Sequence, residues 1–494
     1  MTRSAAASAS AEREGRLYID GEFREAASGR RFEVISPTDE SVVATAADAG
    51  AEDVAAAVAA ARRAADETTW SSDHEFRQQC LRQLQEALRK EIADICVLQT
   101  LEAGTPQQVT PTMEAVVGDM SHYIEMVGSF PWETDFPAFR FLVLDSLRRV
   151  RYEPYGVVGA ITPWNGPFMP NMWKINGSLA TGNTIVLKTA PDSPLTGAAI
   201  AKAAAEHTDI PPGVLNVISS ADRATAGDAL TADQRVDMYH FTGSPSVGQR
   251  IMERAAVGIR KVVLELGGKS ANIVLDDANL DIAVGMGVGY CMANSGQGCT
   301  LATRMIVHSS IYDEVLARVE AMVAATPWGD PMDPVNTVGP IIRASQLDRV
   351  AGLVDRARDA GARVLAGGAR GDREKGFWYL PTALADVDEN SEIAQTEIFG
   401  PVLSIIRFEG SDDEAIRIAN NSPYGLSSYV QTNDPERAWH VANKLKAGTV
   451  NVGLSFHLSP DTPFGGYGQS GLGREHGDDG FREYLQAKTI STPA

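Results

Sequence analysis

A cysteine and a glutamate, each in a segment of small residues, carry the groups needed to make and hydrolyse a thioester. Cys299 lies in Asn-Ser-Gly-Gln-Gly-Cys-Thr (294–300), where no bulky side chain is expected to cover the sulfur. Glu265 lies thirty-four residues upstream and precedes a Leu-Gly-Gly sequence. A thiol can attack a carbonyl carbon, and a carboxylate can later activate the water that releases the acyl group.

The predicted elements place Glu265 at a ligand-binding edge. The apolar run Val262-Val263-Leu264 predicts a buried strand that ends at Glu265. Ligands of open α/β sheets bind at the carboxyl ends of strands. Burial would raise the pKa of the carboxyl group, as a base operating near neutral pH requires. Cys291 is predicted on a helix over 284–294 and is expected to pack in the core.

Strands and helices alternate through two long stretches of the chain. The first has helices predicted over 195–206 and 246–256, among apolar strands at 157–161, 184–188, 214–218, 238–241 and 262–265. The second runs from Gly267 to about Pro460, with strands at 271–275, 305–307 and 402–406. This alternation predicts parallel sheets covered on both faces. Outside it we predict a hairpin at 17–23, helices over 51–67 and 77–98, and strands at 139–152 and 484–490.

Composition excludes several classes of protein. The 494 residues are too many for one ordinary core, so two or three domains are expected. A formal net charge of −20 argues against nucleic acid or an anionic membrane as a partner. No apolar run approaches the length of about 18 residues typical of a membrane span. The four cysteines form no CxxC pair, which predicts no metal site and a reducing, cytoplasmic location. The Ala/Ser-rich segment 1–15 is interpreted as a disordered tail and not a signal peptide.

The segments 264–270 and 294–300, together with Pro163-Trp164-Asn165, resemble the active-site signatures of the aldehyde dehydrogenase superfamily. The resemblance covers almost the whole chain. It implies an α/β fold with a Rossmann-like dinucleotide-binding domain (16–132 and 154–266) and a second α/β catalytic domain (267–465). A small β excursion (133–153 and 478–494) would supply oligomerisation strands for a homotetramer or homodimer.

The resemblance also implies the reaction and the roles of individual residues. An NAD(P)-dependent dehydrogenase would oxidise an aldehyde to a carboxylate through a thiohemiacetal and a thioester on Cys299. Glu265 would activate the hydrolytic water, and the amide of Asn165 would stabilise the oxyanion together with the backbone N–H of Cys299. The residues implied to hold the dinucleotide are Ile161, Thr162, Pro163, Trp164, Lys188, Gly227, Phe241, Thr242, Gly243, Ser244, Leu266, Gly267, Glu397 and Phe399.

One departure from the family pattern concerns the cofactor. Pro191 stands where the family often has a glutamate that binds the ribose hydroxyls, and Asp192 follows one step late. The missing carboxylate would no longer repel a 2′-phosphate, so NADP should be accepted. Because no arginine adjoins Lys188 in the sequence to grip that phosphate, NAD is expected to be preferred.

A second set of residues is predicted to line the substrate tunnel. Because none of them is Arg or Lys, a buried carboxylate on the substrate would find no charged partner. Apolar side chains, and the room left by glycines, predict a medium-to-large hydrophobic or aromatic aldehyde. A small polar aldehyde bound through Ser455 and His457 is the alternative. The tunnel residues are Gly166, Met169, Trp173, Gly298, Thr300, Ser455, Phe456 and His457.

Three other functions remain to be separated from this one. A CoA-acylating semialdehyde dehydrogenase is the near alternative, although such members generally lack the glutamate at position 265. A non-catalytic NAD-binding structural protein would not need Cys299, Glu265 and Asn165 together. A cofactor-independent thiol hydrolase would need His240 or His457 as the partner of Cys299.

Overall fold

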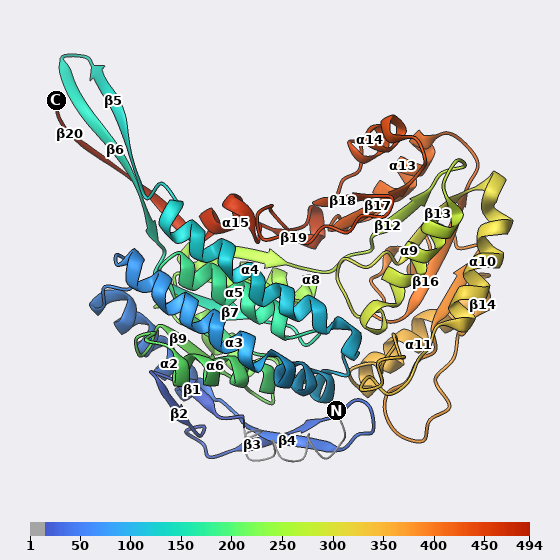
Figure 1. Cartoon of the computed structure of the whole chain (residues 1–494), viewed down its shortest axis with the longest axis horizontal. Coiled ribbons are helices and arrows are strands. Elements are labelled where there is room, and N and C mark those ends of the chain that lie inside the picture. The colour runs from blue at the N-terminus through green and yellow to red at the C-terminus, as the bar shows by residue number, and fades with distance from the viewer. Residues whose placement is uncertain (1–14) are drawn as a thin grey trace.

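The computed structural model describes residues 15–494, which form two α/β bodies and a projecting group of strands (Figure 1). The first body is an eight-stranded sheet with the order β19-β11-β10-β7-β8-β9-β1-β2. Its five central strands are parallel. The strands are β1 (Leu17–Ile19), β2 (Glu22–Arg24), β7 (Val157–Ile161), β8 (Thr184–Lys188), β9 (Leu215–Ile218), β10 (Met238–Thr242), β11 (Lys261–Glu265) and β19 (Gly471–Leu472).

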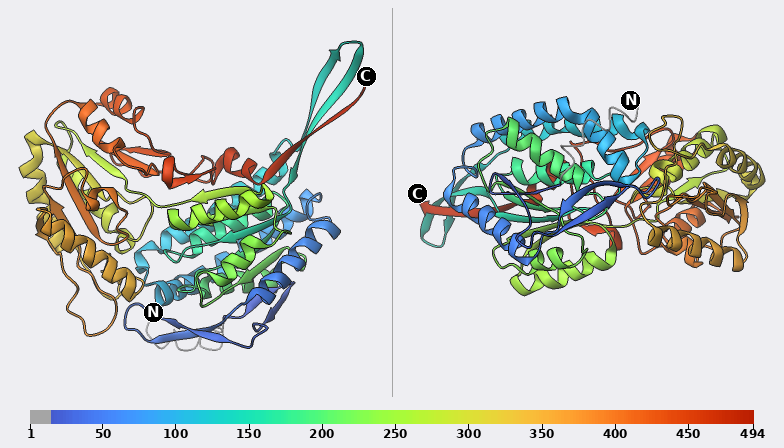
Figure 2. Two further views of the ribbon diagram at one scale, coloured as in Figure 1. Left: turned by 180° about the vertical axis from the view of Figure 1, so that it is seen from behind. Right: turned by 90° about the horizontal axis from the view of Figure 1, so that it is seen from below.

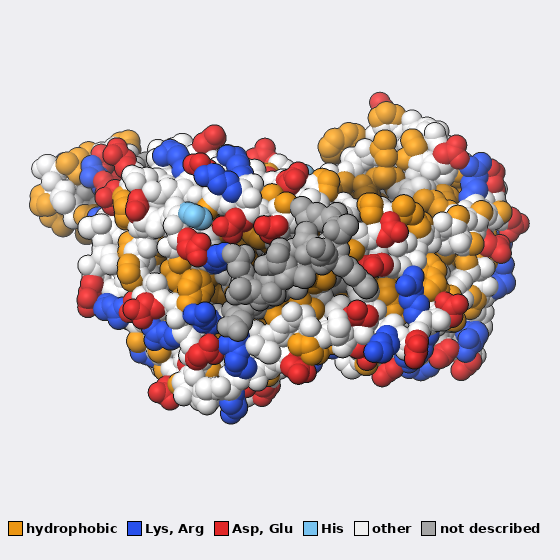
Figure 3. Space-filling model, turned by 60° about the horizontal axis from the view of Figure 1, so that its bottom comes forward, with side chains coloured by type: hydrophobic (Ala, Val, Ile, Leu, Met, Phe, Trp, Pro, Cys, Tyr) orange, Lys and Arg blue, Asp and Glu red, His pale blue; other side chains and the backbone are white. Residues whose placement is uncertain are grey.

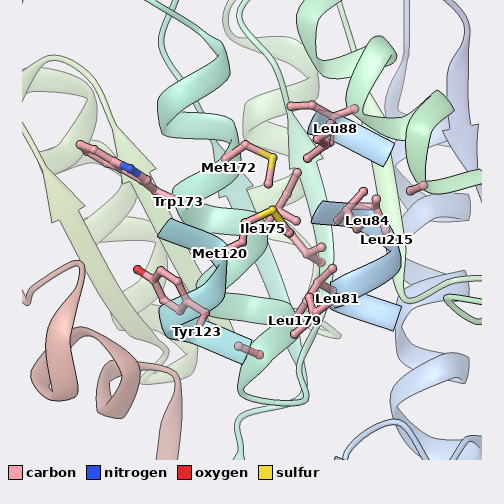
Figure 4. Packing of buried hydrophobic residues seen from close by; sticks show 14 of the residues in the cluster. Leu81, Leu84, Leu88, Met120, Tyr123, Met172, Trp173, Ile175, Leu179 and Leu215 are labelled. Carbon is pink, nitrogen blue, oxygen red and sulfur yellow. The ribbon is translucent and has the colours of Figure 1, made fainter. Parts of the chain in front are cut away.

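Helices cover both faces of this sheet (Figure 2). One face packs against α3 (His74–Ala103), α4 (Thr110–Ser129), α5 (Phe168–Ala180) and α6 (Leu195–His207). The other packs against α2 (Ala51–Glu67), α7 (Thr225–Ala232) and α8 (Pro245–Gly258). Figure 4 shows leucines of α3 meeting Met120 of α4 and Met172 of α5. Burying a side chain of this size stabilises the fold by about 1.5–3 kcal/mol.

The second body is a seven-stranded sheet with the order β14-β15-β16-β13-β12-β17-β18, parallel except at the β14 edge. Its strands are β12 (Ala271–Val274), β13 (Arg304–His308), β14 (Arg363–Ala366), β15 (Thr382–Ala385), β16 (Val402–Phe408), β17 (Ser427–Gln431) and β18 (Thr449–Val452). Its helices are α9 (Leu280–Met292), α10 (Tyr312–Ala325), α11 (Ala344–Asp359), α12 (Glu392–Gln395), α13 (Asp412–Asn420) and α14 (Pro435–Ala442). The helix α15 (Gly477–Glu483) follows β19, and the hairpin β3 (Arg31–Ile35) and β4 (Val42–Ala47) precedes α2.

The projecting group is a three-stranded antiparallel sheet with the order β20-β6-β5. Its strands are β5 (Glu133–Phe141), β6 (Leu144–Pro154) and β20 (Leu485–Pro493). The strand structure predicted at 139–152 is confirmed, but it is divided between two strands, because the chain turns at Leu142, which has a positive φ of 55°. No Gly or Asn marks that turn in the sequence, so its position could not be predicted. Apolar side chains of this group are exposed, at the left end of Figure 3.

Most other predicted elements are confirmed, with ends that differ by a few residues. The helix predicted over 284–294 ends at Met292, because Asn294 and Ser295 adopt left-handed backbone conformations. Of the tail predicted over 1–15, only Gly15 is described, and it is paired with Ala46. Within residues 15–494, no helix is long and apolar enough to cross a membrane.

Candidate active site

Four strand ends meet at one edge of the first sheet. The register pairs Ile161 of β7 with Lys188 of β8, and Thr242 of β10 with Glu265 of β11. The chain then crosses to the second sheet, whose loop after α9 carries Cys299. At Gly268 the two segments meet so closely that a side chain there would overlap the carbonyl oxygen of Cys299. The predicted thiol and carboxylate therefore face each other across the two bodies.

The thiol of Cys299 lies close enough to the buried carboxyl group of Glu265 for each group to shift the pKa of the other. Burial, reinforced by the nearby Glu475, raises the pKa of Glu265 to about 8. Burial and the adjacent Glu265 also raise the pKa of the Cys299 thiol well above its ordinary value. Cys299 is half-buried and not fully exposed, and the backbone at Gly268 packs against its carbonyl oxygen. The Oε1 atom of Glu265 has no hydrogen-bond partner and is left to receive a proton.

The loop before Cys299 is held in an unusual backbone conformation. Asn294, Ser295 and Gly296 have consecutive positive φ values of 46°, 59° and 69°. A left-handed conformation at a non-glycine residue costs about 1–3 kcal/mol and persists only where the surroundings hold it. The side chain of Gln297 supplies such a restraint, since its Nε2 donates to Pro340 O at 3.2 Å and its Oε1 accepts from Ile342 N at 3.0 Å. The sulfur is thus carried by a preorganised turn.

Asn165 lies beside the same loop. Its Nδ2 donates to the carbonyl oxygen of Gln297 at 3.1 Å, which leaves the second N–H of the amide for another acceptor. The neighbouring Gly166 has a positive φ of 72°, and a Cβ there would meet no atom within 4 Å. This agrees with the predicted room beside the asparagine.

The groove along the strand ends has features that fit a dinucleotide. Thr162 donates its backbone N–H to Lys188 O at 3.1 Å, and its buried Oγ1 has no partner. A Cβ on Gly227 would lie 3.8 Å from Ile161, so the glycine leaves a shallow slot between them. Ser244 caps α8 without a side-chain hydrogen bond to it. Because Pro245 has no N–H and the amides of Val247 and Gly248 donate to Ser244 O, the N–H of Ser246 is the one left at this helix start for an anion.

The other side of this groove comes from the second body. Glu397 accepts a hydrogen bond from Gly268 N at 2.9 Å, and burial raises the pKa of its carboxyl group to about 7. Phe399, with a positive φ of 59°, meets the ring of Trp164 edge-on at 5.2 Å. Leu266 donates its N–H to Ser470 O at 2.9 Å. These contacts bring the predicted cofactor residues of both bodies together.

The surroundings of Lys188 differ from the expectation that no arginine adjoins it. Arg223 lies close enough for its charge, added to the effect of burial, to lower the pKa of Lys188 to about 8. Arg223 holds Asp192 through contacts of 2.8 and 3.0 Å, and Arg343 reaches the same carboxylate at 3.4 Å. The sequence alone could not indicate this, because Arg223 is on the loop after β9.

The predicted tunnel residues fall into two groups. Phe456 packs on Tyr290 at 5.2 Å, Tyr290 packs on Tyr429, and Tyr429 donates its hydroxyl to Thr300 O at 3.0 Å. This aromatic cluster therefore starts next to the thiol. Met169 and the buried Trp173 pack against the large core cluster of the first body.

The remaining tunnel residues have partners within the protein. Ser455 Oγ bonds the backbone of Val452, and His457 Nε2 bonds Thr462 Oγ1 at 2.6 Å. The space expected at Gly298 is occupied, because a Cβ there would lie 2.9 Å from Leu301. His240 is bound to Tyr484 and faces Glu475, so neither histidine is free to partner the thiol as a hydrolase would require.

A buried ion pair that the sequence did not indicate lies behind Glu265. Lys174 of α5 donates to Thr242 Oγ1 and to Glu475 Oε1, both at 2.6 Å. Burial opposes ionisation of Glu475, but Lys174 and His240 outweigh it and hold the pKa of that carboxyl group below its ordinary value. No three His, Cys, Asp or Glu side chains of the described part of the chain are grouped to hold a metal ion.

Comparison with known proteins agrees with this geometry. The model of the aldehyde dehydrogenase family matches residues 23–490. The chain belongs to this family. An aldehyde dehydrogenase of Davidiella tassiana is 38% identical over 478 residues, which cover 96% of this chain and 94% of the relative. A solved aldehyde dehydrogenase from Bacillus cereus, described as an NAD+ complex, is 35% identical with a TM-score of 0.94 and covers 100% of this chain and 99% of its own. A variant of the indole-3-acetaldehyde dehydrogenase AldA of P. syringae, in complex with NAD+ and IAA, is 35% identical with a TM-score of 0.93 and full coverage of both chains.

Proposed function

We propose that this aldehyde dehydrogenase family member oxidises a hydrophobic or aromatic aldehyde to the carboxylate, with NAD(P) as cofactor. The observation that carries the proposal is the half-buried Cys299 next to the buried Glu265 at the carboxyl edge of a parallel sheet, with one carboxyl oxygen unpartnered. The presence of Glu265 favours hydrolysis of the acyl group over its transfer to CoA.

The mechanism follows from the positions of three side chains. Cys299 releases its proton to solvent and attacks the aldehyde carbon as a thiolate, giving a thiohemiacetal. The free N–H of Asn165 and the backbone N–H of Cys299 stabilise the developing oxyanion. A nicotinamide held beside Glu397 and Phe399 would supply the acceptor for the hydride of this carbon, so that Cys299 would be left carrying a thioester. In its ionised form Glu265 takes a proton from water, and the hydroxide that forms attacks the thioester carbon. The C–S bond breaks, and the Cys299 thiolate that leaves takes back a proton, which frees the carboxylate product.

The cofactor groove supports this assignment through its own unsatisfied groups. Thr162 Oγ1 and the amide of Ser246 offer donors for phosphate oxygens, and Glu397 offers an acceptor for ribose hydroxyls. The related B. cereus protein binds NAD+. Lys188 and Arg223 would together face a 2′-phosphate. We therefore expect the preference for NAD over NADP to be weaker than the sequence alone predicts.

The proposed substrate class rests on the charges and rings near Cys299. The aromatic cluster of Phe456, Tyr290 and Tyr429 offers apolar surface, at about 25 cal/mol per Å² buried. Asp119 of α4 lies near Asp461, and burial together with that charge raises the pKa of Asp119 to about 6. The carboxyl groups of Asp119 and of Asp461, which is part of the 453–462 loop, would repel an anionic semialdehyde. The related AldA, an indole-3-acetaldehyde dehydrogenase, was found with IAA bound.

Assembly is proposed to use the projecting strands. Phe136, Phe139, Phe141 and Leu147 of this group are 46–65% exposed in the single chain. Exposed apolar side chains on an edge of this kind favour burial against another subunit. A homodimer or homotetramer is therefore proposed, and a cytoplasmic location remains a prediction from the cysteines.

The experiment that tests the function compares four aldehydes with each dinucleotide. NAD(P)H formation at 340 nm would give kcat/KM for octanal, benzaldehyde, acetaldehyde and succinic semialdehyde. We expect octanal or benzaldehyde to have the highest value. A higher value for either of the last two would refute the substrate class, and no reduced cofactor with any aldehyde would refute the activity.

A further inference from the structure

A buried chain of polar side chains continues beyond the ion pair. Lys174 and His240 both meet the same oxygen of Glu475, at 2.6 and 2.7 Å. On its other side His240 bonds the hydroxyl of Tyr484 through Nδ1. Each of these four side chains is at most 4% exposed. This series of contacting polar side chains begins at Thr242, the register partner of Glu265. It ends at Tyr484, which directly precedes β20.

We propose that His240 and Tyr484 are positioning residues for the general base: they keep Glu475 anionic beside Lys174 and thereby set the charge around Glu265. The inference rests on the proposed role of Glu265 in thioester hydrolysis. His240 and Tyr484 touch neither the thiol nor the cofactor groove, so their effect must pass through the ion pair.

The protonation of this chain follows from its geometry. Burial lowers the pKa of His240 to about 4, with the charge of Lys174 adding to the effect, so the ring is neutral and carries one N–H. Tyr484 has a hydroxyl to donate to Nδ1, which places the ring N–H on Nε2, facing Glu475. Without Tyr484 the ring could take the other tautomer, and Glu475 Oε1 would lose the N–H that now lies on a nitrogen 2.7 Å away, a contact with a poor hydrogen-bond angle.

Loss of the N–H of His240 Nε2 would change the ion pair between Lys174 and Glu475. Glu475 is buried and its Oε2 already lacks a partner, so Oε1 carries all of its stabilisation. A buried ion pair is stable only while hydrogen bonds offset its desolvation. With His240 turned or removed, transfer of a proton from Lys174 to Glu475 would leave two neutral groups.

The effect on Glu265 has a defined sign. Among the charges around Glu265, Glu475 raises its pKa more than Lys174 lowers it, and Glu397 raises it further. Neutralising the pair therefore removes a net upward influence, and the pKa of Glu265 should fall. The other titratable groups around the chain are His476, which is bonded to Tyr123 at 2.8 Å, and Glu483 next to Tyr484. Neither side chain contacts Glu265, so neither should change the pKa of Glu265.

Two tyrosines give a matched test. Tyr484→Phe removes the hydroxyl that orients His240, and His240→Leu removes the donor itself. Tyr123→Phe is the control, because it removes an equally buried tyrosine–histidine bond in which neither side chain bonds the carboxylate of Glu475. Rapid mixing of each enzyme with benzaldehyde, or octanal if that is the better substrate, and NAD over pH 5–10 separates the NADH burst from the slower turnover that follows.

We expect the acid limb of the post-burst rate to move to lower pH by at least half a unit in both variants, with the burst retained. The control should keep the wild-type profile. An infrared titration of the protonated carboxyl band that Glu265→Gln removes should show the same fall in pKa. Unshifted profiles and an unshifted band in Tyr484→Phe, the milder change, would overturn the inference. Unchanged turnover in Glu265→Gln would instead refute the proposed function of the base.

Discussion

Replacing Glu265 by glutamine should have opposite effects on catalysis and on stability. Glutamine has nearly the same shape but cannot take a proton from water. We expect Glu265→Gln to form about one equivalent of NADH per active site and then stall, because the thioester is made but not hydrolysed. Loss of a general base typically lowers the rate of its step by about 10²–10⁴-fold.

The stability effect can be worked from the burial of the carboxyl group. Its pKa rises from an ordinary value of 4.5 to about 8 in the folded enzyme. The folded state therefore keeps a proton that the unfolded chain releases above pH 4.5, and wild-type stability falls as the pH rises from 4.5 to about 8. At 1.36 kcal/mol per pH unit the full loss is about 5 kcal/mol, an upper bound. Glutamine has no such proton, so the variant should not lose this stability.

The assay is urea unfolding followed by tryptophan fluorescence at pH 5 and pH 9. We expect the midpoint of Glu265→Gln to exceed that of the wild type clearly at pH 9 and little at pH 5. Glu253→Gln, on the exposed face of α8, is the control and should change neither midpoint. An equal difference at both pH values would show that Glu265 does not hold a proton at neutral pH, and the reasoning on its burial would fail.

Three further variants test the thiol, the amide and the cofactor groove. Cys299→Ala should abolish NADH formation while cofactor binding, measured by calorimetry, stays intact; appreciable turnover would contradict the role of the thiol. Asn165→Ala should lower kcat by about 10²–10³-fold with little change in the KM for NAD, and a smaller loss would mean that the backbone donor suffices. Arg223→Ala should lower kcat/KM for NADP about tenfold, equivalent to about 1.4 kcal/mol, and leave that for NAD unchanged. Arg356→Ala, an arginine of similar exposure paired with Glu392, is its control; an equal loss with both dinucleotides would assign Arg223 a structural role.

The sequence predicted those parts of the site that follow directly from strand ends. An apolar run followed by Glu265 implies a strand that stops at the carboxylate, and parallel pairing brings such ends to one edge. The same reasoning placed Lys188 and Thr242. Family resemblance supplied what no local pattern could, namely that Glu397 and Phe399 of the second body face this edge.

Features that depend on side chains from distant segments were not predictable in this way. Arg223 approaches Lys188 because the loop after β9 folds back over the strand end, and no periodicity in that loop indicates its direction. The partial burial of Cys299 is a second feature that depends on a distant segment. Small residues were expected to leave the sulfur uncovered, but they also let the backbone at Gly268 approach the carbonyl oxygen of Cys299, and this cysteine is half-buried.

The placement of Glu475 shows why the electrostatics of the base could not be read from the sequence. The strand β19 has only two residues, too few for a recognisable pattern, yet it pairs antiparallel with the end of β11 and sets Gly471 opposite Glu265. Glu475 follows four residues later and meets Lys174, which is 301 positions away in the chain. The charge that helps to raise the pKa of Glu265 thus depends on how the C-terminal segment docks. Changes that loosen this docking should affect hydrolysis of the thioester before they affect its formation, because Cys299 and Asn165 are held by other loops.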